Sequence, residues 1–274
     1  MKPDRRHMLK AIGQVGLLAL PSGAFADAPV ANDPWPGLVT GIFHDRKLED
    51  GAHIMALNAP VRAENAAIVP VSVRLRLPPG DQRLLQKLWL VVDQNPSPLV
   101  GTFTIGHKSG MTALATRVRV DAYSNVHAVA KLSDGRLYMV KRFVKAAGGC
   151  SAPMIEAMAP GQQIGQMRFR EVGSFTAASP DRAEGILMIR HPNNSGMQMD
   201  QVSLLYIPTD VIERLDVWQG DDLIMSMDGG ISIAQNPHFR FNYIRNGTKL
   251  IRALARDTKG MVYEHDWTIG KSST

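Results

Sequence analysis

The stretch Val69-Pro70-Val71-Ser72-Val73-Arg74-Leu75-Arg76-Leu77 decides the fold class. Its apolar side chains occupy every second position, so an extended chain would bury one face and leave the other in water. Similar short runs recur along the sequence, and turn-forming stretches such as Asn95-Pro96-Ser97-Pro98 and Ser133-Asp134-Gly135 separate them. Short strands at this spacing are typical of antiparallel sandwiches. The sequence therefore predicts an all-β protein with two immunoglobulin-like β-sandwich domains joined by a linker.

The expected domains are residues 32–150 and 174–274. Besides the first strand, we expect strands at residues 87–93, 100–105, 114–123, 126–132, 136–144, 185–190, 201–207, 214–218, 221–227, 238–244, 249–256 and 261–269. A short helix is expected within 32–43, with Asn32 or Asp33 as its N-cap.

Between the two blocks, residues 151–173 replace alternation with prolines, glycines and glutamines. This composition predicts a linker, with a helical turn at residues 154–158. In the second block, Phe239, Phe241 and Tyr243 share one face of a strand. We therefore expect this block to own a separate core.

The first 26 residues have the three parts of a signal peptide. Basic residues 2–10 precede an apolar run at 11–20 and the small-residue site Ala24-Phe25-Ala26, which predicts cleavage after Ala26. Within this leader, Asp4-Arg5-Arg6-His7-Met8-Leu9-Lys10 resembles the twin-arginine export motif, with Met8 where phenylalanine is usual. We expect export to the periplasm by that route.

The net charge and hydropathy exclude two classes of partner. The formal charge is +6, but the leader carries four basic residues and one acid, so +3 remains for the rest of the chain. That remainder has no basic run, which gives no case for nucleic acid. No later apolar stretch approaches the roughly 18 residues that span a bilayer, so no membrane insertion of the mature chain is expected.

Cys150, the sole cysteine, lies in Gly148-Gly149-Cys150-Ser151-Ala152-Pro153. An exported chain with one cysteine cannot form an internal disulfide, which favours a use for the thiol. The glycine pair predicts a mobile arm, and the nearby cations Lys141, Arg142 and Lys145 predict a lowered thiol pKa. The competing interpretation is a small buried hydrophobe.

The sequence motifs give little support for an enzymatic site or a metal site. The sequence contains no glycine-rich phosphate loop, Gly-x-Ser-x-Gly elbow or His-Glu-x-x-His pair. A nucleophilic Cys150 paired with a histidine would lack a fixed oxyanion site. Met197 and Met199 lie near His191 and could bind a soft metal, whereas Met225 and Met227 are more simply core residues of a strand. We expect no catalytic residues, no metal ligands and no cofactor.

Several motifs resemble a known family, the sulfur-oxidation carriers SoxY and SoxZ fused in one chain. The first block resembles SoxY and the second resembles SoxZ, in the right order over residues 45–270. The SoxY-like motifs are Leu57-Asn58-Ala59-Pro60, Ala63-Glu64-Asn65-Ala66, Ile68-Val69-Pro70-Val71, Asn95-Pro96-Ser97-Pro98-Leu99-Val100 and Gly148-Gly149-Cys150. The SoxZ-like motifs are Ile189-Arg190-His191-Pro192, Gly196, Ile233-Ala234-Gln235-Asn236-Pro237, residues 239–243 and residues 257–267.

This resemblance implies a non-enzymatic carrier that bears sulfur intermediates covalently on Cys150, with Gly148 and Gly149 as a swinging arm. It implies partners among sulfur-oxidation enzymes, namely a haem sulfur transferase and a thiol hydrolase. The chain looks most like the fused carriers associated with quinoprotein dehydrogenases, so the alternative is an adaptor or maturation factor for such a dehydrogenase, with a vestigial cysteine. One departure is that Ser151-Ala152-Pro153 follows the cysteine, where SoxY ends in Gly-Gly.

Overall fold

The computed structural model describes residues 33–154, 163–174 and 181–270, so the leader and all but the first residue of the turn expected at 154–158 lie outside it. These ranges contain helix α1 (Trp35–Phe43) followed by strands. The strands of the first half are β1 (Leu48–Asp50), β2 (Met55–Asn58), β3 (Val69–Leu75), β4 (Leu85–Val92), β5 (Leu99–Ile105), β6 (Ala113–Val118), β7 (Ser124–Leu132) and β8 (Leu137–Val144). Those of the second half are β9 (Met167–Ser174), β10 (Arg182–Ile189), β11 (Ile212–Gln219), β12 (Asp222–Gly229), β13 (His238–Ile244), β14 (Leu250–Asp257) and β15 (Val262–Thr268).

Strand β3 has the alternation that its sequence predicts. Val69, Val71, Val73 and Leu75 are buried, and Arg74 between them is exposed. Pro70 fits because β2 pairs with β3 only from Ser72 onward, so Pro70 has a neighbouring strand on one side alone. A proline is tolerated there because it cannot donate to a second ladder. The all-β prediction is confirmed.

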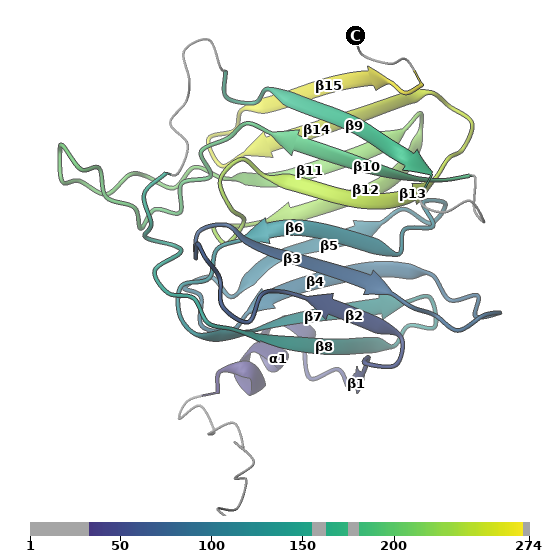
Figure 1. The fold of residues 1–274 in the computed structure, drawn as a ribbon, viewed down its shortest axis with the longest axis horizontal. Coiled ribbons are helices and arrows are strands. Elements are labelled where there is room, and N and C mark those ends of the chain that lie inside the picture. The colour runs from purple at the N-terminus through teal and green to yellow at the C-terminus, as the bar shows by residue number, and fades with distance from the viewer. Residues whose placement is uncertain (1–32, 155–162, 175–180, 271–274) are drawn as a thin grey trace, which may run out of the picture. The chain divides into compact units, whose positions relative to one another are not determined.

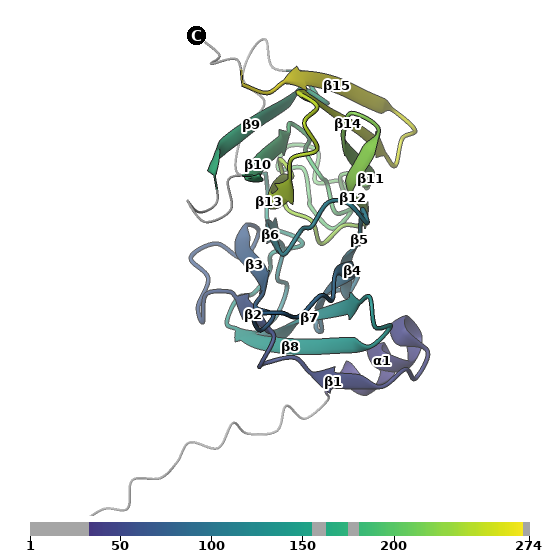
Figure 2. The ribbon, with the colours of Figure 1, turned by 90° about the vertical axis from the view of Figure 1, so that its right-hand side faces the viewer.

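The strands form two layers that both run through the two halves (Figures 1 and 2). One sheet has the order β1-β8-β7-β4-β5-β12-β11-β14-β15, and the other has the order β2-β3-β6-β13-β10-β9. The halves meet where β5 pairs with β12 and where β6 pairs with β13, both antiparallel. Each half is two-layered, as expected, but its sheets continue into the other half.

The prediction of a separate second core is wrong. Buried residues of both halves belong to one cluster, in which Phe103 of β5 lies 6.2 Å from Phe239 of β13 between ring centroids. Residues from Pro34 onward form one compact unit. Because both sheets continue from one half into the other, the buried residues between them form one cluster and not two separate cores.

Three local predictions also change. Residues 201–207 do not form a strand, because the Asp200 side chain accepts hydrogen bonds from the backbone amides of Val202 and Ser203 and turns the chain. The expected linker is shorter than 151–173, since β9 begins at Met167. Helix α1 starts at Trp35 with Pro34 in the N-cap position and without a side-chain cap.

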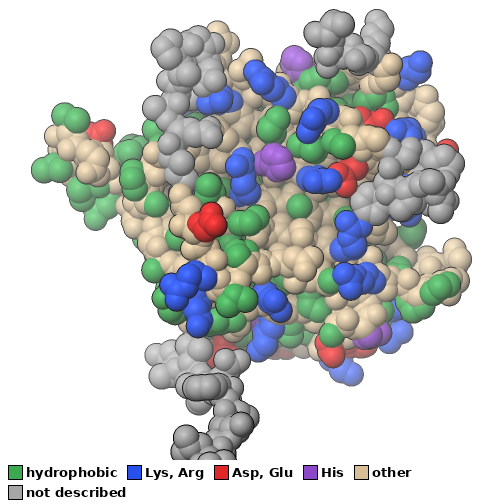
Figure 3. Space-filling view, viewed as in Figure 1, with side chains coloured by type: hydrophobic (Ala, Val, Ile, Leu, Met, Phe, Trp, Pro, Cys, Tyr) green, Lys and Arg blue, Asp and Glu red, His purple; other side chains and the backbone are tan. Residues whose placement is uncertain are grey.

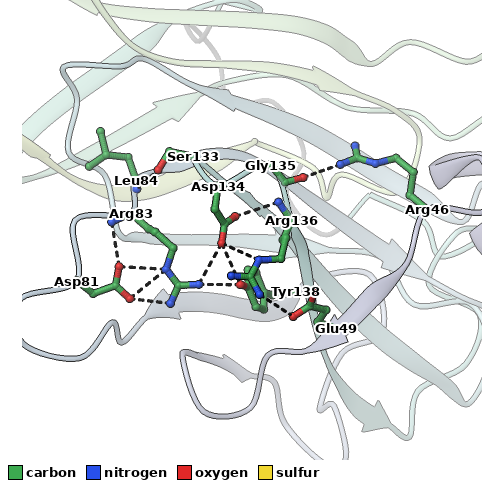
Figure 4. A network of polar contacts seen from close by, with 10 residues as sticks. All are labelled: Arg46, Glu49, Asp81, Arg83, Leu84, Ser133, Asp134, Gly135, Arg136 and Tyr138. Carbon is green, nitrogen blue, oxygen red and sulfur yellow. Dashed lines mark hydrogen bonds and ion pairs between the residues drawn. The ribbon is translucent and has the colours of Figure 1, made fainter.

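A polar network fixes the turn end of the β7–β8 hairpin (Figure 4). Arg83 contacts Asp81 and Asp134, and its Nη1 lies 2.7 Å from the Tyr138 hydroxyl. Hydrogen bonds from the Arg83 side chain and then from its backbone lower the pKa of Asp81 to about 2. The opposite end of this hairpin, at Val144, leads directly into the segment that carries Cys150.

Candidate functional site

Cys150 is completely buried, with 0% of its surface exposed. Residues 148–152 form a turn, closed by a hydrogen bond from the Ala152 amide to the Gly148 carbonyl at 3.0 Å. In this structure the cysteine is enclosed, as in the competing interpretation of a buried residue, and the mobility of the arm stays a prediction. We call residues 148–152 the arm.

The two glycines of the arm play different parts. Gly148 is exposed and has φ of +74°, which disfavours residues with a side chain. Gly149 instead lies in a narrow slot, where an added Cβ would come within 2.2 Å of the Ala66 carbonyl oxygen and 2.6 Å of that of Val120. Both atoms belong to the backbone, so the slot accepts a glycine and no larger residue without movement.

The first half of the chain holds the arm through the segment that follows β6. The amide of Gly148 donates to the Asp121 carbonyl at 2.7 Å, and that of Gly149 donates to the Val120 carbonyl at 3.1 Å. The amide of Cys150 donates to Asp121 Oδ1 at 3.0 Å. Three successive amides of the arm are thereby satisfied.

Arg119 joins the arm to the second half. Its guanidinium is 1% exposed and donates to the carbonyls of Gly149 and Asn193, each at 3.0 Å. A buried guanidinium is costly unless it is hydrogen-bonded, and burial lowers the pKa of Arg119. Its contacts therefore require the arm and the Asn193 backbone to lie together.

The second half covers the arm with residues 191–210, which we call the latch loop. Ser195 Oγ donates to the Cys150 carbonyl, and Gln198 Nε2 donates to the Ala152 carbonyl at 3.0 Å. The Gln198 side chain also accepts from the Ser195 amide at 3.0 Å, which orients both residues. The arm is thus hydrogen-bonded from both halves.

The tip of the latch loop is apolar and exposed. Asn194 bridges to Asp210 at the base of the loop, and Met199 bridges to Tyr206 further out. Tyr206 is more than 60% exposed, and so are Leu204 and Leu205 beyond the bridge, where Val202 is 93% exposed. The loop projects between β10 and β11 in Figure 1, and Figure 3 shows hydrophobic side chains gathered on it.

The thiol is not activated in this position. Burial first, and then the charge of Asp121, raise the pKa of Cys150 to about 12, and the opposing effect of Arg119 is smaller. Lys141, Arg142 and Lys145 are exposed, and the predicted lowering of the pKa by these residues is wrong. Since the thiolate is the reactive form, the enclosed thiol is chemically quiet near neutral pH.

The structure brings Cys150, Gly148 and Gly149 together with residues that the sequence did not indicate. Arg119, Asp121, Ser195 and Gln198 come from distant segments and carry no local motif. His191 faces Asp210 and Asp257. Met225 and Met227 are buried in the core, as expected. In the part of the chain that the structure describes, no helix has the length and apolar character needed to cross a membrane.

Comparison with known proteins gives a match for each half. The family model of the sulfur oxidation protein SoxY matches residues 39–150, and that of the sulphur oxidation protein SoxZ matches residues 175–268. The SoxY match ends at Cys150, the residue held in the arm. A search of curated protein sequences finds no match.

Among solved structures, the chain is similar to the sulfur carrier protein SoxY from Chlorobium limicola f thiosulfatophilum, with 23% identity and a TM-score of 0.33 over 41% of this chain and 94% of that one. It is also similar to the superoxide reductase (neelaredoxin) from Ignicoccus hospitalis, with 13% identity and a TM-score of 0.28 over 34% of this chain and 80% of that one. The two family models together span most of the chain and fall in sequence order. The chain therefore belongs to the sulfur-oxidation families SoxY and SoxZ, as a fused SoxYZ-like protein with a SoxY domain followed by a SoxZ domain.

Proposed function

We propose that this protein is an exported carrier that bears sulfur intermediates covalently on Cys150 and presents them to enzymes of sulfur oxidation. The observation that carries the proposal is the position of the sole cysteine, at the end of the SoxY match and in a slot built by both domains. The leader supports export to the periplasm by the twin-arginine route.

The arm is held in a way that suits release. The six hydrogen bonds that hold it to the rest of the protein all use its backbone: three amides and the carbonyls of Gly149, Cys150 and Ala152. Each bond contributes about 1 kcal/mol net, and the entropy lost in ordering the arm offsets part of their sum. The open arm would then be a rare state, and a partner that binds it would raise its population.

Loading requires the open state, because the thiol must reach both solvent and an oxidant. With thiosulfate as the donor, the Cys150 sulfur and the terminal sulfur of thiosulfate form a new S–S bond. One proton leaves the thiol, and two electrons pass one at a time through the haem of the partner sulfur transferase to its electron acceptor. In the closed state the raised thiol pKa and the burial both oppose this step.

The latch loop offers a route from partner binding to release. Its exposed apolar tip and its two arm-holding residues, Ser195 and Gln198, lie on the same projecting segment. A sulfur-oxidation enzyme that buries Leu204, Leu205 and Tyr206 would draw the loop away from the arm. Apolar side chains exposed together are typical of such contacts.

The decisive experiment is the intact mass of protein purified from its source without reductant, measured before and after reduction. We expect a reductant-labile gain in mass that maps to Cys150 and is absent from a Cys150→Ser variant. Incubation with thiosulfate and the haem sulfur transferase should load the bare protein in the same way. A thiol that stays bare under both conditions, with a Cys150→Ser strain that keeps full function, would refute the carrier and support an adaptor for a quinoprotein dehydrogenase.

A further inference from the structure

Three buried side chains of the SoxZ domain converge on one point. His191 follows β10, Asp210 precedes β11, and Asp257 ends β14. The register of β11 on β14, which sets Ile212 opposite Asp257, brings these segments together. The three side chains are at most 4% exposed, and their ligand atoms lie within 4.8 Å of one another.

Each carboxylate is oriented by hydrogen bonds on its outer side. Asp257 Oδ1 accepts from the amides of Lys259 and Met261, each at 2.9 Å. Asp210 Oδ2 accepts from the Lys259 ammonium at 2.6 Å. The other oxygens, Asp210 Oδ1 and Asp257 Oδ2, face the imidazole.

The imidazole of His191 is oriented too. Its Nδ1 lies 2.8 Å from Asn193 Oδ1, which also accepts from the Ile212 amide at 3.1 Å and is thereby identified as the oxygen of that amide group. The Asn193 backbone amide also donates to Nδ1, at 3.1 Å, so Asn193 contacts this nitrogen through both its backbone and its side chain. In the tautomer whose Nδ1 donates its proton to Asn193 Oδ1, the lone pair of Nε2 points at the carboxylates. Such a second hydrogen bond is what fixes a histidine that ligates a metal.

Two of the three facing atoms lack partners of their own. His191 Nε2 and Asp210 Oδ1 have no hydrogen-bond partner within the described segments. The distances from Nε2 are 3.5 Å to Asp210 Oδ1 and 3.6 Å to Asp257 Oδ2, longer than a charge-assisted hydrogen bond of about 2.8 Å. Asp257 Oδ2 already accepts from the Tyr263 hydroxyl. Leaving the other two buried atoms without a partner beside a second carboxylate is costly unless a proton or a metal cation lies between them.

The spacing fits a small divalent metal. Zinc binds histidine nitrogen and carboxylate oxygen at about 2.0–2.2 Å, which separates neighbouring ligands of a tetrahedral site by roughly 3.3–3.6 Å. The two measured separations agree with this range. One imidazole and two carboxylates form a donor set of the kind that zinc and similar first-row metals accept.

We propose that His191 Nε2, Asp210 Oδ1 and Asp257 Oδ2 bind a divalent transition metal, with zinc as the reference ion. The Tyr263 hydroxyl donates to Asp257 Oδ2 at 2.8 Å and so helps to orient that ligand atom. The proposal departs from the sequence-based expectation that the chain has no metal ligands, and it is independent of the carrier function.

The site would brace the latch loop, because His191 and Asp210 are its two ends. Asn193 connects the site to the arm: its side chain contacts His191, and its carbonyl accepts from Arg119, which also holds Gly149. Metal binding should therefore slow hydrogen exchange of backbone amides in residues 191–210.

The test uses the chain carrying Cys150→Ser, which removes the thiol as a competing ligand. Protein stripped with a chelator is titrated with Zn²⁺ by calorimetry and with Co²⁺ by visible absorption, which reports the coordination geometry. We expect one equivalent to bind and the melting temperature to rise. Asp257→Asn and Asp210→Asn, which keep the side-chain shape, should each weaken Zn²⁺ binding by about 100-fold or more.

The matched control is Asp93→Asn. Asp93 forms the other buried His–Asp pair with His127 at 3.1 Å, a direct contact without a third ligand in the described segments. This variant should bind Zn²⁺ like its parent. The proposal is overturned if the folded, stripped parent binds no equivalent of Zn²⁺, or if Asp257→Asn and Asp210→Asn bind it as tightly as the parent does.

Discussion

Both domains hold the arm, and the contacts from the SoxY side and from the SoxZ side are built differently. The SoxY side consists of Arg119, Val120 and Asp121, which continue the chain after β6; Arg119 and Val120 are buried, and Val120 belongs to the common core. The SoxZ side is the latch loop, which holds the arm with two side chains, Ser195 and Gln198, and has an exposed tip. The comparison suggests a fixed seat on the SoxY side and a removable cover on the SoxZ side.

Among the variants, Gly149→Ala should have the largest effect on the alkylation rate of Cys150, because it fills the slot in the seat. The added methyl group would collide with the carbonyl oxygens of Ala66 and Val120, neither of which is the end of a flexible side chain. Overpacking of about 3 kcal/mol should open the arm and accelerate alkylation of Cys150 by about 100-fold.

The control for this variant is Gly37→Ala, because no atom lies within 4 Å of a Cβ added at Gly37. Its Cys150 should be alkylated at the wild-type rate. A Gly149→Ala protein that folds and reacts as slowly as wild type would show that the slot does not hold the arm.

Arg119→Gln should have the next largest effect, because it removes the charged donor shared by Gly149 and Asn193. Loss of about 2 kcal/mol of charge-assisted bonding should speed alkylation about 30-fold. Arg117→Gln is the control, since Arg117 donates instead to the Asn236 carbonyl. Equal rates for the two variants would contradict a specific role for Arg119.

Ser195→Ala tests the cover. It removes the hydrogen bond to the Cys150 carbonyl, worth about 1 kcal/mol, and should speed alkylation about fivefold with little change in melting temperature. Ser203→Ala is the matched control on the same loop, because Ser203 Oγ contacts Asp200 and not the arm. If both variants react alike, the latch loop does not cover the thiol.

A separate effect concerns the dependence of stability on pH. Because the pKa of Cys150 is raised to about 12, the folded protein holds the thiol proton more tightly than the unfolded chain does. The resulting stability is complete below about pH 9, the ordinary thiol value, and is lost as the pH rises toward 12. Chemical denaturation from pH 8 to 11 should therefore show a steeper loss in wild type than in Cys150→Ser; parallel curves would contradict the burial.

Much of the fold can be predicted from the sequence, because in long strands such as Val69–Leu75 the alternation of apolar and polar residues is visible without the structure. Strands β1 and β2 are too short to show a period. Strand β9 does alternate, with Met167 and Phe169 between arginines, but it adjoins a stretch of glycines and glutamines. The run at Val202–Tyr206 has strand-like composition, and the Asp200 turn overrides it.

The site was harder to predict. A sole cysteine after two glycines marks Cys150 without any structure. Its enclosure depends on residues 29 to 45 positions away in the chain, such as Asp121 and Ser195, and on sheets that continue from one domain into the other. Pairing across domains leaves no signal in the local pattern of either one.

The most direct measurement is the alkylation rate of Cys150 in the native wild-type protein, compared with the same chain unfolded in urea at the same pH. With six hydrogen bonds closing the arm, the account predicts a native rate at least about 1,000-fold slower, and a rise when the sulfur-oxidation partner is added. A native thiol that reacts as fast as the unfolded one would contradict the closed arm, and with it the division into seat and cover.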